Sequence, residues 1–432
     1  MEEEKRKEEE IPKEKKEVEK EVEKEVEKEG EGEGEEHSKK KSRRRRRKRK
    51  DDSDGPKDDK SFYDGPEIPQ TDPPTVPVFK VYPKKSFPVG EIQEHWGDFN
   101  TFRMTSEEKR HLDRLDETMI YDLREAAAIH KTVRQWARPF IKPGVPLIDI
   151  ATKIEQKVLE LLPKDGLNKG MAFPCGVSLN HVAAHYTSNP GDKWVLGEHD
   201  IAKIDFGVHV NGHIIDSAFS VHFDSELDPL SEAAREATNT GVKHCGADAY
   251  ISDIGEAIQE VMESYEVTLN GKTHSVRSVR NLSGHSVQKY LIHAGKSVPL
   301  VRGGERIRME EGEVFAIETF GTTGKGFVRE DLDTSHYMRP FDSGHVNVRM
   351  GKARGLLKVI TENFGTLAFA RRWLDDLGES RYLLALKHLV DCGAVEPYPP
   401  LCDVRGSFVS QFEHTVYLRP SHKEVLSRGD DY

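Results

Sequence analysis

The chain has 432 residues, of which 65 are Lys or Arg and 76 are Asp or Glu, giving a net charge of −11. This length can bury a large core, but 33% charged residues indicates that part of the chain does not fold. No apolar run could span a membrane, MEEEKRKEEE is no signal peptide, and the four cysteines lack CxxC spacing. We therefore expect a cytoplasmic protein with free thiols, no membrane anchor and no cysteine-based zinc site.

The excess charge is concentrated in residues 1–60, which we predict to be a disordered, low-complexity tail. Residues 1–36 hold 18 Glu and 9 Lys or Arg, and residues 39–50 hold eleven basic side chains in twelve positions. Residues 61–432 then carry 43 basic and 53 acidic side chains, so their surface is not suited to DNA. The basic run is open to three interpretations: a nuclear localisation signal, a ribosomal RNA contact or a solvated tail.

A proline-rich stretch, GPEIPQTDPPTVPVF, follows at residues 65–79, and we expect an extended linker over residues 61–90. From Thr105 to about Leu162 the apolar residues recur at helical spacing, with a Pro-Gly break in IKPGVPLIDIATKI. This pattern predicts amphipathic helices at the start of a catalytic domain that we place at residues 91–432.

Strand-like segments come next, first MAFPCGVSL and VAAHYT, then KIDFGVHVNGHIID and AFSVHF. Helices are predicted at residues 225–246 and 251–265, then apolar strands within residues 281–328, and helices again at about 350–395. The chain closes with the alternating strand GSFVSQFEHTVYLRP. Helices and antiparallel strands in separate blocks predict an α+β domain, with a helical insertion at about residues 335–398.

The hairpin KIDFGVHVNGHIID places an aspartate in each of its two apolar strands. If its Asn-Gly pair forms a two-residue type I′ turn, Asp205 lies opposite Ala218. The carboxylate of Asp216 then projects from the same face, with the two β-carbons roughly 5 to 8 Å apart. Two buried anions are costly to desolvate unless a cation lies between them, which points to divalent metal ions. The alternative is that one aspartate faces solvent or caps a turn.

Three more ionisable residues lie among apolar strand residues: His285 in NLSGHSV, Glu318 in VFAIETF and Glu413 in SQFEHTV. Singly, each has an ordinary interpretation, because a glutamate in a sheet usually faces water and a glycine-flanked histidine usually lies in a turn. With the two aspartates, however, the set carries four negative charges, which two divalent cations neutralise. Oxygen ligands with one imidazole suit manganese, cobalt or iron(II) better than zinc, and such a pair would activate a water for hydrolysis.

Other motifs do not support a second kind of site. The GTTGKG sequence at residues 321–326 looks like a phosphate-binding loop, but Thr319 occupies its first-glycine position and no Ser or Thr follows the lysine. Neither HExxH nor GxSxG occurs in the chain. The sequence therefore gives no indication of a nucleotide site, a zincin helix or a serine nucleophile.

The segments DFGVHVNGHIID, GHSVQKYLIHAG, EEGEVFAIETFGT and SQFEHTVYLRP resemble, in order and spacing, the ligand segments of the type 2 methionine aminopeptidases, the pita-bread metallopeptidases of family M24. The resemblance covers roughly residues 90–432 and extends to the acidic and basic tail of eukaryotic members. It implies a pita-bread fold, with a pseudo-twofold β-sheet flanked by helices and a C-terminal helical insertion. It also implies cotranslational removal of the initiator methionine from nascent polypeptides with a small second residue.

The resemblance implies a role for each ligand residue. Asp216 and Glu413 are expected to bridge two divalent metal ions. Asp205 is expected to be a terminal ligand of one ion, and His285 and Glu318 ligands of the other. A hydroxide formed at the two ions would attack the first peptide carbonyl while the free amino group binds one ion. Only a terminal amine can occupy that position, so the activity would be that of an exopeptidase.

The resemblance also extends to the substrate-binding residues. His185 in AAHYTSNPGD matches the catalytic histidine near the substrate's amino end, and His293 in LIHAG matches a second one at the scissile peptide. Further matches surround the methionine side chain; they are Phe173, Ile292, Phe320, His336, Tyr398 and Ala368. Without the match, Ile292 and Ala368 would be assigned to the ordinary core. His181 departs from the small polar residue expected at its position, and we expect surface variation there.

Two other functions remain to be distinguished. An X-Pro peptidase of the same fold would cleave peptides with proline second and a residue other than methionine first, but the helical insertion argues against it. A binding protein without chemistry would associate with ribosomes or with translation initiation factor two. Catalytically inactive relatives usually lose ligands, whereas all five are present here. The charged tail still makes ribosome or initiation-factor association an expected additional property.

Overall fold

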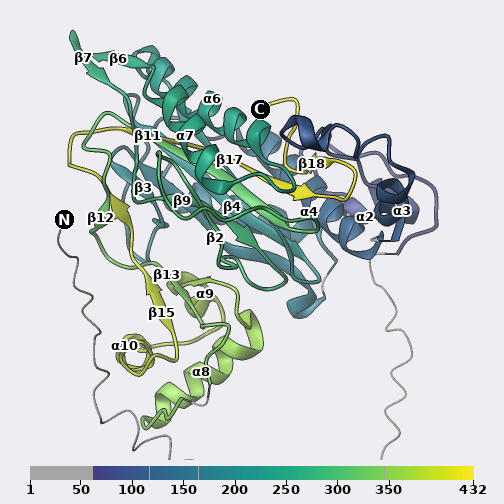
Figure 1. The fold of residues 1–432 in the computed structure, drawn as a ribbon. Helices are drawn as coiled ribbons and strands as arrows, with labels where there is room; N and C mark the ends of the chain where they lie inside the picture. Colours follow the sequence, from purple (N-terminus) through teal and green to yellow (C-terminus); the bar gives the residue numbers. More distant parts are fainter. Residues whose placement is uncertain (1–61, 116, 164, 345) are drawn as a thin grey trace, which may run out of the picture. The chain divides into compact units, whose positions relative to one another are not determined.

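Residues 62–432, apart from positions 116, 164 and 345, are described by the computed structural model (Figure 1). The charged tail and its basic run therefore lie outside the described residues. Within the described part, no helix is both long and apolar enough to cross a membrane.

The proline-rich segment largely lacks regular structure but belongs to the same compact unit as the rest of the described chain. It ends in a short helix, α2 (Val78–Val81), in which Val78 is 1% exposed. The Pro74 carbonyl accepts a hydrogen bond from the buried Lys157 ammonium at 2.7 Å. The second part of the segment is therefore packed on the domain, whereas an extended linker was expected.

The first half of the domain consists of helices followed by an antiparallel sheet. The helices are α3 (Glu107–Leu115), α4 (Glu117–Ala137) and α5 (Leu147–Leu161), and the strands are β2 (Lys169–Leu179), β3 (Val182–Ala184), β4 (Ile201–Val210) and β5 (His213–His222). The sheet order is β2-β4-β5, and the short strand β3 belongs to a separate sheet. Helix α4 packs on β4 and β5, and α5 packs on β2. The apolar residues that recur at helical spacing in the sequence thus form the helix faces that pack on this sheet.

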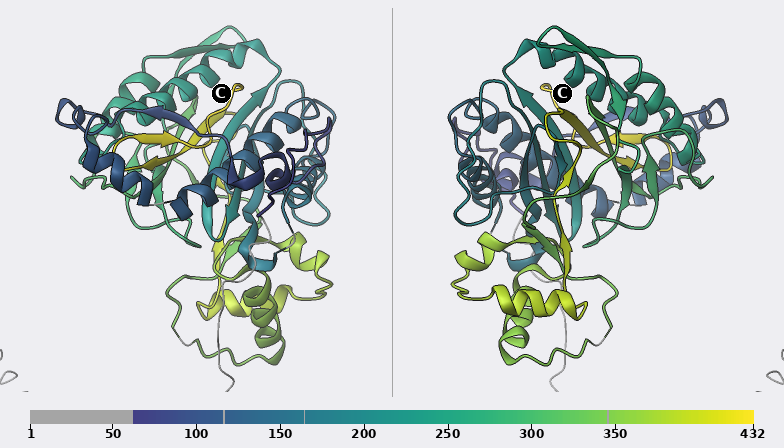
Figure 2. Two further views of the ribbon diagram at one scale, coloured as in Figure 1. Left: turned by 90° about the vertical axis from the view of Figure 1, so that its right-hand side faces the viewer. Right: turned by 90° about the vertical axis from the view of Figure 1, so that its left-hand side faces the viewer.

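The second half repeats this order of elements. Its helices are α6 (Asp228–His244) and α7 (Ile251–Met262), and its sheet contains β1 (Glu91–Gln93), β8 (Arg277–Ser278), β9 (Ser283–Val287), β10 (Ser297–Pro299), β11 (Val314–Thr322), β17 (Val409–Leu418) and β18 (Lys423–Val425). Helix α6 packs on β11 and β17, and α7 packs on α6 and β10. Two halves, each with paired helices over an antiparallel sheet, give the predicted pseudo-twofold arrangement (Figure 2).

A helical insertion follows β12 (Arg329–Glu330). Its elements are β13 (His336–Met338), α8 (Gly351–Phe364), β14 (Phe369–Ala370), α9 (Arg371–Asp376), α10 (Leu383–Asp391) and β15 (Glu396–Tyr398). Its buried side chains, such as Leu356, Ile360 and Leu389, form a cluster separate from the main core, and Figure 2 shows it below the two sheets. The chain then returns to the sheets through β16 (Leu401–Cys402).

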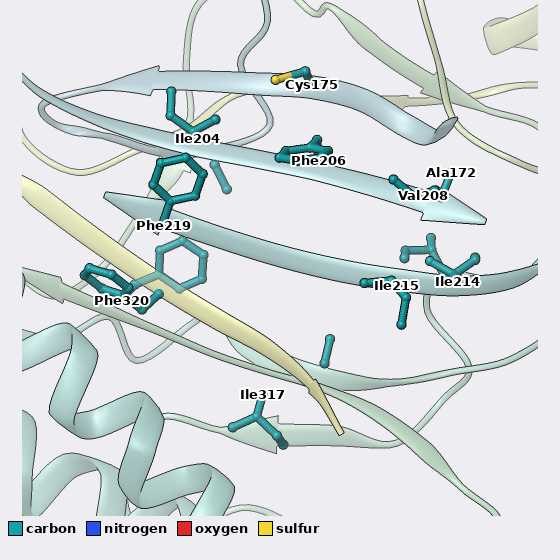
Figure 3. Close-up of a cluster of buried hydrophobic side chains, with 14 of the residues drawn as sticks. Ala172, Cys175, Ile204, Phe206, Val208, Ile214, Ile215, Phe219, Ile317 and Phe320 are labelled. Carbon is teal, nitrogen blue, oxygen red and sulfur yellow. The ribbon is translucent and has the colours of Figure 1, made fainter. Parts of the chain in front are cut away.

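The hairpin of β4 and β5 has the register expected from its Asn-Gly turn. Val210 pairs with His213 and Asp205 with Ala218, and both turn residues have the positive φ of a type I′ turn, 51° and 83°. Phe206, labelled in Figure 3, belongs to the main core and stacks on His130 of α4. Because side chains alternate between the two faces of a strand, Asp205 takes the opposite face. Register alone therefore directs the aspartates away from the helices.

A second Asn-Gly hairpin, formed by β6 (Glu266–Leu269) and β7 (Lys272–Ser275), is absent from the elements that we predicted. Its turn residues, Asn270 and Gly271, also have positive φ, so the sequence carries the same turn signal as in the first hairpin. The neighbouring strands are short and partly exposed, which weakens the apolar alternation that marks a strand.

A buried ion pair joins the insertion to the first half. Arg372 of α9 donates to Glu155 of α5 at 2.5 Å, and the two side chains are only 8% and 7% exposed. Glu155 also accepts from the Cys175 amide of β2 at 2.8 Å and from Trp373 Nε1 at 2.9 Å. Arg372 donates in addition to Thr187 Oγ1 at 3.0 Å. The docking of the insertion therefore depends on two charges that are matched away from water.

Replacing Arg372 with Met should lower the free energy of unfolding by about 3 to 5 kcal/mol, because the buried Glu155 carboxylate would lose its counter-charge. The measurement is the urea midpoint of the full chain. Lys387→Met is the matched control: it breaks an exposed pair with Asp391 and should change the free energy by about 0.5 kcal/mol or less. Equal midpoints for the two variants would contradict the importance of the buried pair.

Candidate metal and substrate site

The residues that the sequence singled out line one cavity of about 100 Å³. All candidate ligand, catalytic and pocket residues contribute to its wall; they are Phe173, His185, Asp205, Asp216, His285, Ile292, His293, Glu318, Phe320, His336, Ala368, Tyr398 and Glu413. They come from both sheets and from the insertion. The cavity therefore exists only where the two halves and the insertion meet.

Three candidate ligands form a close group at this cavity. Asp216, His285 and Glu413 each offer one ligand atom, and these atoms all lie within 4.8 Å of one another. His285 Nε2 lies 3.5 Å from Asp216 Oδ2 and 3.9 Å from Glu318 Oε1. The imidazole thus stands between carboxylates from two different sheets.

A glutamine that the sequence did not single out connects the remaining carboxylates. Gln411 Nε2 lies 3.4 Å from Asp205 Oδ2 and 3.1 Å from Glu318 Oε2. One amide nitrogen carries two donors, so it can serve both carboxylates and orient them. Gln411 shares a face of β17 with Glu413, and this i, i+2 spacing is the signal by which the sequence could have identified it.

Burial controls the protonation of the four carboxylates. It raises the pKa of Asp205 to about 7, while the hydrogen bond from Gln411 acts in the opposite direction. Burial first, and repulsion from neighbouring carboxylates second, raise the pKa values of Asp216, Glu318 and Glu413 well above their usual range. In the protein alone the ionised forms of these carboxylates are therefore disfavoured, and a nearby positive charge would favour them.

The donor set fits divalent metal ions. Among the described residues, Asp205 Oδ1 and both carboxylate oxygens of Glu413 are buried without a hydrogen-bond partner. Burial lowers the pKa of His285 to about 3, which keeps its imidazole neutral and able to bind a metal. Buried oxygens without donors, beside one neutral imidazole, are the ligands that hard or borderline divalent cations prefer.

Three further histidines and a tyrosine form the wall beside this group. The ring of Tyr398 lies 5.8 Å from that of His185 and 6.2 Å from that of His293, and His185 lies 6.3 Å from His336. Burial lowers the pKa of His185 to about 4 and that of His336 to about 3, and it also lowers the pKa of His293. All three imidazoles are therefore neutral at pH 7.

The backbone of His185 is unusual. Its φ angle is +64°, in the left-handed region that residues with a β-carbon seldom adopt. Such conformations persist where the surrounding contacts impose them, and they occur often at functional sites. Here Ser335 contacts the His185 carbonyl at 3.4 Å, and its hydroxyl accepts from the Thr187 amide at 3.2 Å.

The rest of the cavity wall is mainly apolar. Phe320 is 1% exposed and Ile292 is 9% exposed, and Leu282 and Met338, which were not predicted, also line the cavity. The remaining unpredicted lining residues are Pro174, Gly176, Ser178 and Ala184. Leu282 and Met338 lie in segments whose apolar residues could equally belong to the core, so no sequence signal separates them. An apolar side chain can thus bind here with a polar end group directed at the carboxylates.

The motifs that we set aside are unrelated to this cavity. In the GTTGKG loop, the amides of Lys325 and Gly326 donate to Asp403 at 3.1 and 3.2 Å, and Thr322 Oγ1 donates to the same carboxylate at 2.9 Å. The loop therefore binds an anion of the chain itself, which agrees with its rejection as a phosphate site. His181 lies at the turn between β2 and β3 and does not line the cavity.

Comparisons with known proteins agree with this geometry. The sequence model of metallopeptidase family M24 matches residues 122–351. Methionine aminopeptidase 2A from Arabidopsis thaliana is 56% identical over 365 residues, which are 84% of this chain and 82% of that protein. Methionine aminopeptidase 2 from Schizosaccharomyces pombe is 56% identical over 363 residues, 84% of this chain and 85% of its own.

A solved structure supports the fold alone. The structure of a thermophilic Arx1 has a TM-score of 0.60 at 17% identity and covers 73% of this chain and 91% of its own. The family model spans more than half of the chain, and the relatives match it across most of both lengths. The chain has the pita-bread fold of metallopeptidase family M24 and belongs, within that family, to the type 2 methionine aminopeptidases.

Proposed function

We propose that this chain removes the initiator methionine from nascent proteins whose second residue is small. The observation that carries the proposal is one buried cavity that joins five candidate metal ligands to an apolar pocket. Relatives named methionine aminopeptidase 2, at 56% identity, support the same activity. The substrate would enter with its methionine side chain in the pocket and its free amino group toward the carboxylates.

The proposed metal centre uses the five ligands in unequal roles. Two divalent ions would be held by these five residues: Asp216 and Glu413 would serve both ions, Asp205 would serve the first, and His285 with Glu318 would serve the second. When bound, the two ions, which we expect to be manganese, cobalt or iron(II), polarise the scissile carbonyl and lower the pKa of a water molecule. Gln411 holds the outer carboxylates in orientation, which is the usual role of a partner behind metal ligands.

We assign the histidines of the cavity wall to substrate binding and proton transfer. A neutral imidazole offers one donor and one acceptor nitrogen, so His185 and His293 can hydrogen-bond the substrate or move a proton. The His293 ring lies 4.5 Å from that of His285, which supports our assignment of His293 to the scissile peptide, beside the proposed second ion. We assign His185 to the amino end of the substrate, and Phe173, Ile292, Phe320, His336, Ala368 and Tyr398 to the methionine pocket.

A cytoplasmic setting and an association with ribosomes or with translation initiation factor two complete the proposal. Nascent chains are the substrate, so the enzyme must work where they emerge. The basic run at residues 39–50 has the charge to contact RNA phosphates, whereas residues 61–432 are net acidic. The charged tail would thus bind the ribosome, and residues 61–432 would carry out the hydrolysis.

A peptide assay tests the function. We expect the full chain, loaded with manganese or cobalt, to release methionine from Met-Ala-Ser, because the pocket fits one apolar side chain beside the ligands. Met-Val-Ser should be cleaved more slowly if the second subsite excludes bulk, and EDTA should abolish both reactions. Turnover of Ala-Pro-Ser in place of Met-Ala-Ser would identify an X-Pro peptidase. If the protein binds two ions but cleaves none of the three peptides, the enzymatic proposal is overturned.

Two alanine variants separate metal binding from catalysis. Glu413→Ala should lose most of the bound metal, because it removes a bridge and leaves the other buried carboxylates unmatched. His185→Ala should retain both ions while turnover falls by about 10² to 10⁴-fold. Metal content and single-turnover rates are measured in parallel, with Asp391→Ala as an exposed control. Loss of metal from the His185 variant would contradict its assignment to the substrate.

Removal of residues 1–60 should leave peptide turnover unchanged and weaken salt-sensitive ribosome binding. The basic side chains that would displace counterions from RNA phosphates lie in this tail. The measurement is co-sedimentation with ribosomes at low and high salt. A shorter deletion, of residues 1–36, retains the basic run and should preserve binding. If the chain lacking residues 1–60 still co-sediments at low salt, the tail is not the contact.

A further inference from the structure

Two sheet edges meet at the proposed metal centre without forming a ladder. Strand β5 is the edge of its sheet and pairs with β4 along its length. Strand β17 pairs with β11 on one side and with β18 on the other, but with β18 only at Val416–Leu418, so residues 409–415 have no strand partner on that side within the described part of the chain. Strands β5 and β17 contact each other at a junction that we call the seam, and no backbone register joins them. Figure 3 shows β17, in yellow, running obliquely past the strand that carries Ile215 and Phe219. Asp216 and Glu413 lie on opposite sides of this seam, so their separation depends on how the two edges are joined.

On the cavity side, hydroxyl groups replace backbone partners. Thr415 Oγ1 accepts from the Asp216 amide at 2.8 Å and donates to the Asp216 carbonyl at 2.6 Å. Farther along the seam, Ser220 Oγ accepts from the Gln411 amide at 2.9 Å and donates to the Gln411 carbonyl at 3.0 Å. Each hydroxyl thus satisfies both polar groups of a residue on the opposite edge.

On the helix side, directly behind the two carboxylates, a third connection uses Tyr432. Its Oη lies 2.7 Å from Ser217 Oγ and 2.9 Å from the Ala218 carbonyl, and Ser217 Oγ lies 2.7 Å from the Glu413 carbonyl. These three short oxygen–oxygen distances involve only two hydroxyl protons, one on Ser217 and one on Tyr432. Tyr432 Oη also lies 3.4 Å from the Glu413 carbonyl. Loss of the Tyr432 hydroxyl therefore removes the donor to the Ala218 carbonyl, and loss of the Ser217 hydroxyl leaves the Glu413 carbonyl with this long contact in place of a short one.

The surroundings of Tyr432 hold its ring in this position. The ring stacks on His414 at 4.8 Å and meets Phe412 edge to face at 5.5 Å, so it contacts both neighbours of Glu413 in sequence. The guanidinium of Arg134, from α4, lies 4.2 Å above the ring and forms two bonds with Asp431, at 2.8 and 2.6 Å. Helix α4 thereby clamps the segment that ends in Tyr432.

We propose that Tyr432, acting through Ser217, is a positioning residue that sets the separation of the Asp216 and Glu413 carboxylates across the seam. The inference rests on the proposed metal centre, in which these two carboxylates bridge the ions. Without a ladder, the relative position of the two strands depends on side-chain bonds, and the Tyr432 contact connects Ser217, the residue after Asp216, with the carbonyl of Glu413. Its loss should loosen the bridging pair without removing any ligand.

The test compares Tyr432→Phe and Ser217→Ala with the wild-type full chain. Both changes keep the ligands and nearly all of the packing, and remove one hydroxyl. Calorimetric titration with manganese gives the two affinities, and electron paramagnetic resonance of the loaded protein reports the magnetic coupling of the metal pair. We expect the weaker of the two affinities to fall about tenfold in each variant, with altered coupling.

Tyr382→Phe is the matched control, because it removes a tyrosine hydroxyl that donates to the Arg371 carbonyl at 2.9 Å, within the insertion. It should lower thermal stability to a similar extent but leave both manganese affinities unchanged. Manganese affinities within twofold of wild type in Tyr432→Phe, whatever its thermal stability, would overturn the proposal.

The readout also separates this inference from the proposed function. Manganese binding requires no peptide turnover, so failure to release methionine would leave the positioning role intact. Failure of the wild-type chain to bind two manganese ions would instead remove the metal centre, and the positioning role with it.

Discussion

Four carboxylates buried at one point are the constraint on which the rest of this structure depends. Asp205, Asp216, Glu318 and Glu413 come from four strands of two sheets, and burial and mutual repulsion make their ionised forms unfavourable without a cation. A fold can hold such groups together only if other elements pack on the opposite face of the strands that carry them and keep these strands in position. The paired helices of each half and the apolar core beneath them supply that support; Figure 3 shows part of this core.

The halves themselves join through side chains. Strand β5 meets the part of β17 that is not paired with β18, so the backbone polar groups that face each other there need partners that a ladder does not supply. The hydroxyls of Ser217, Ser220 and Thr415 provide them and let the strands pass obliquely. The same junction therefore satisfies the backbone and locates the carboxylates, so stability and metal binding depend on common contacts.

The insertion is coupled to the cavity in a comparable way. The Glu155–Arg372 pair fixes α9 against the first half, and Arg372 also bonds Thr187, two positions beyond His185. The Thr187 amide donates to Ser335, which precedes a histidine of the pocket wall. The docking of the insertion and the strained backbone of His185 are thus parts of one hydrogen-bonded network, which explains how a peripheral unit can shape a substrate pocket.

The sequence by itself determined most of the helices and strands, the shared face of Asp205 and Asp216, and the family, but it missed the hairpin of β6 and β7. The Asn-Gly turn sets the register that puts Asp205 and Asp216 on one face, because alternation along a strand is a local rule. The same rule placed Gln411 beside Glu413 but did not show that it bonds two carboxylates from other strands. Only the tertiary structure decided the seam, the docked insertion and the location of Tyr432. Ser217 and Tyr432 are 215 positions apart in the sequence. A local pattern specifies the face of the strand or helix on which a side chain lies, but not which distant residues pack against that face.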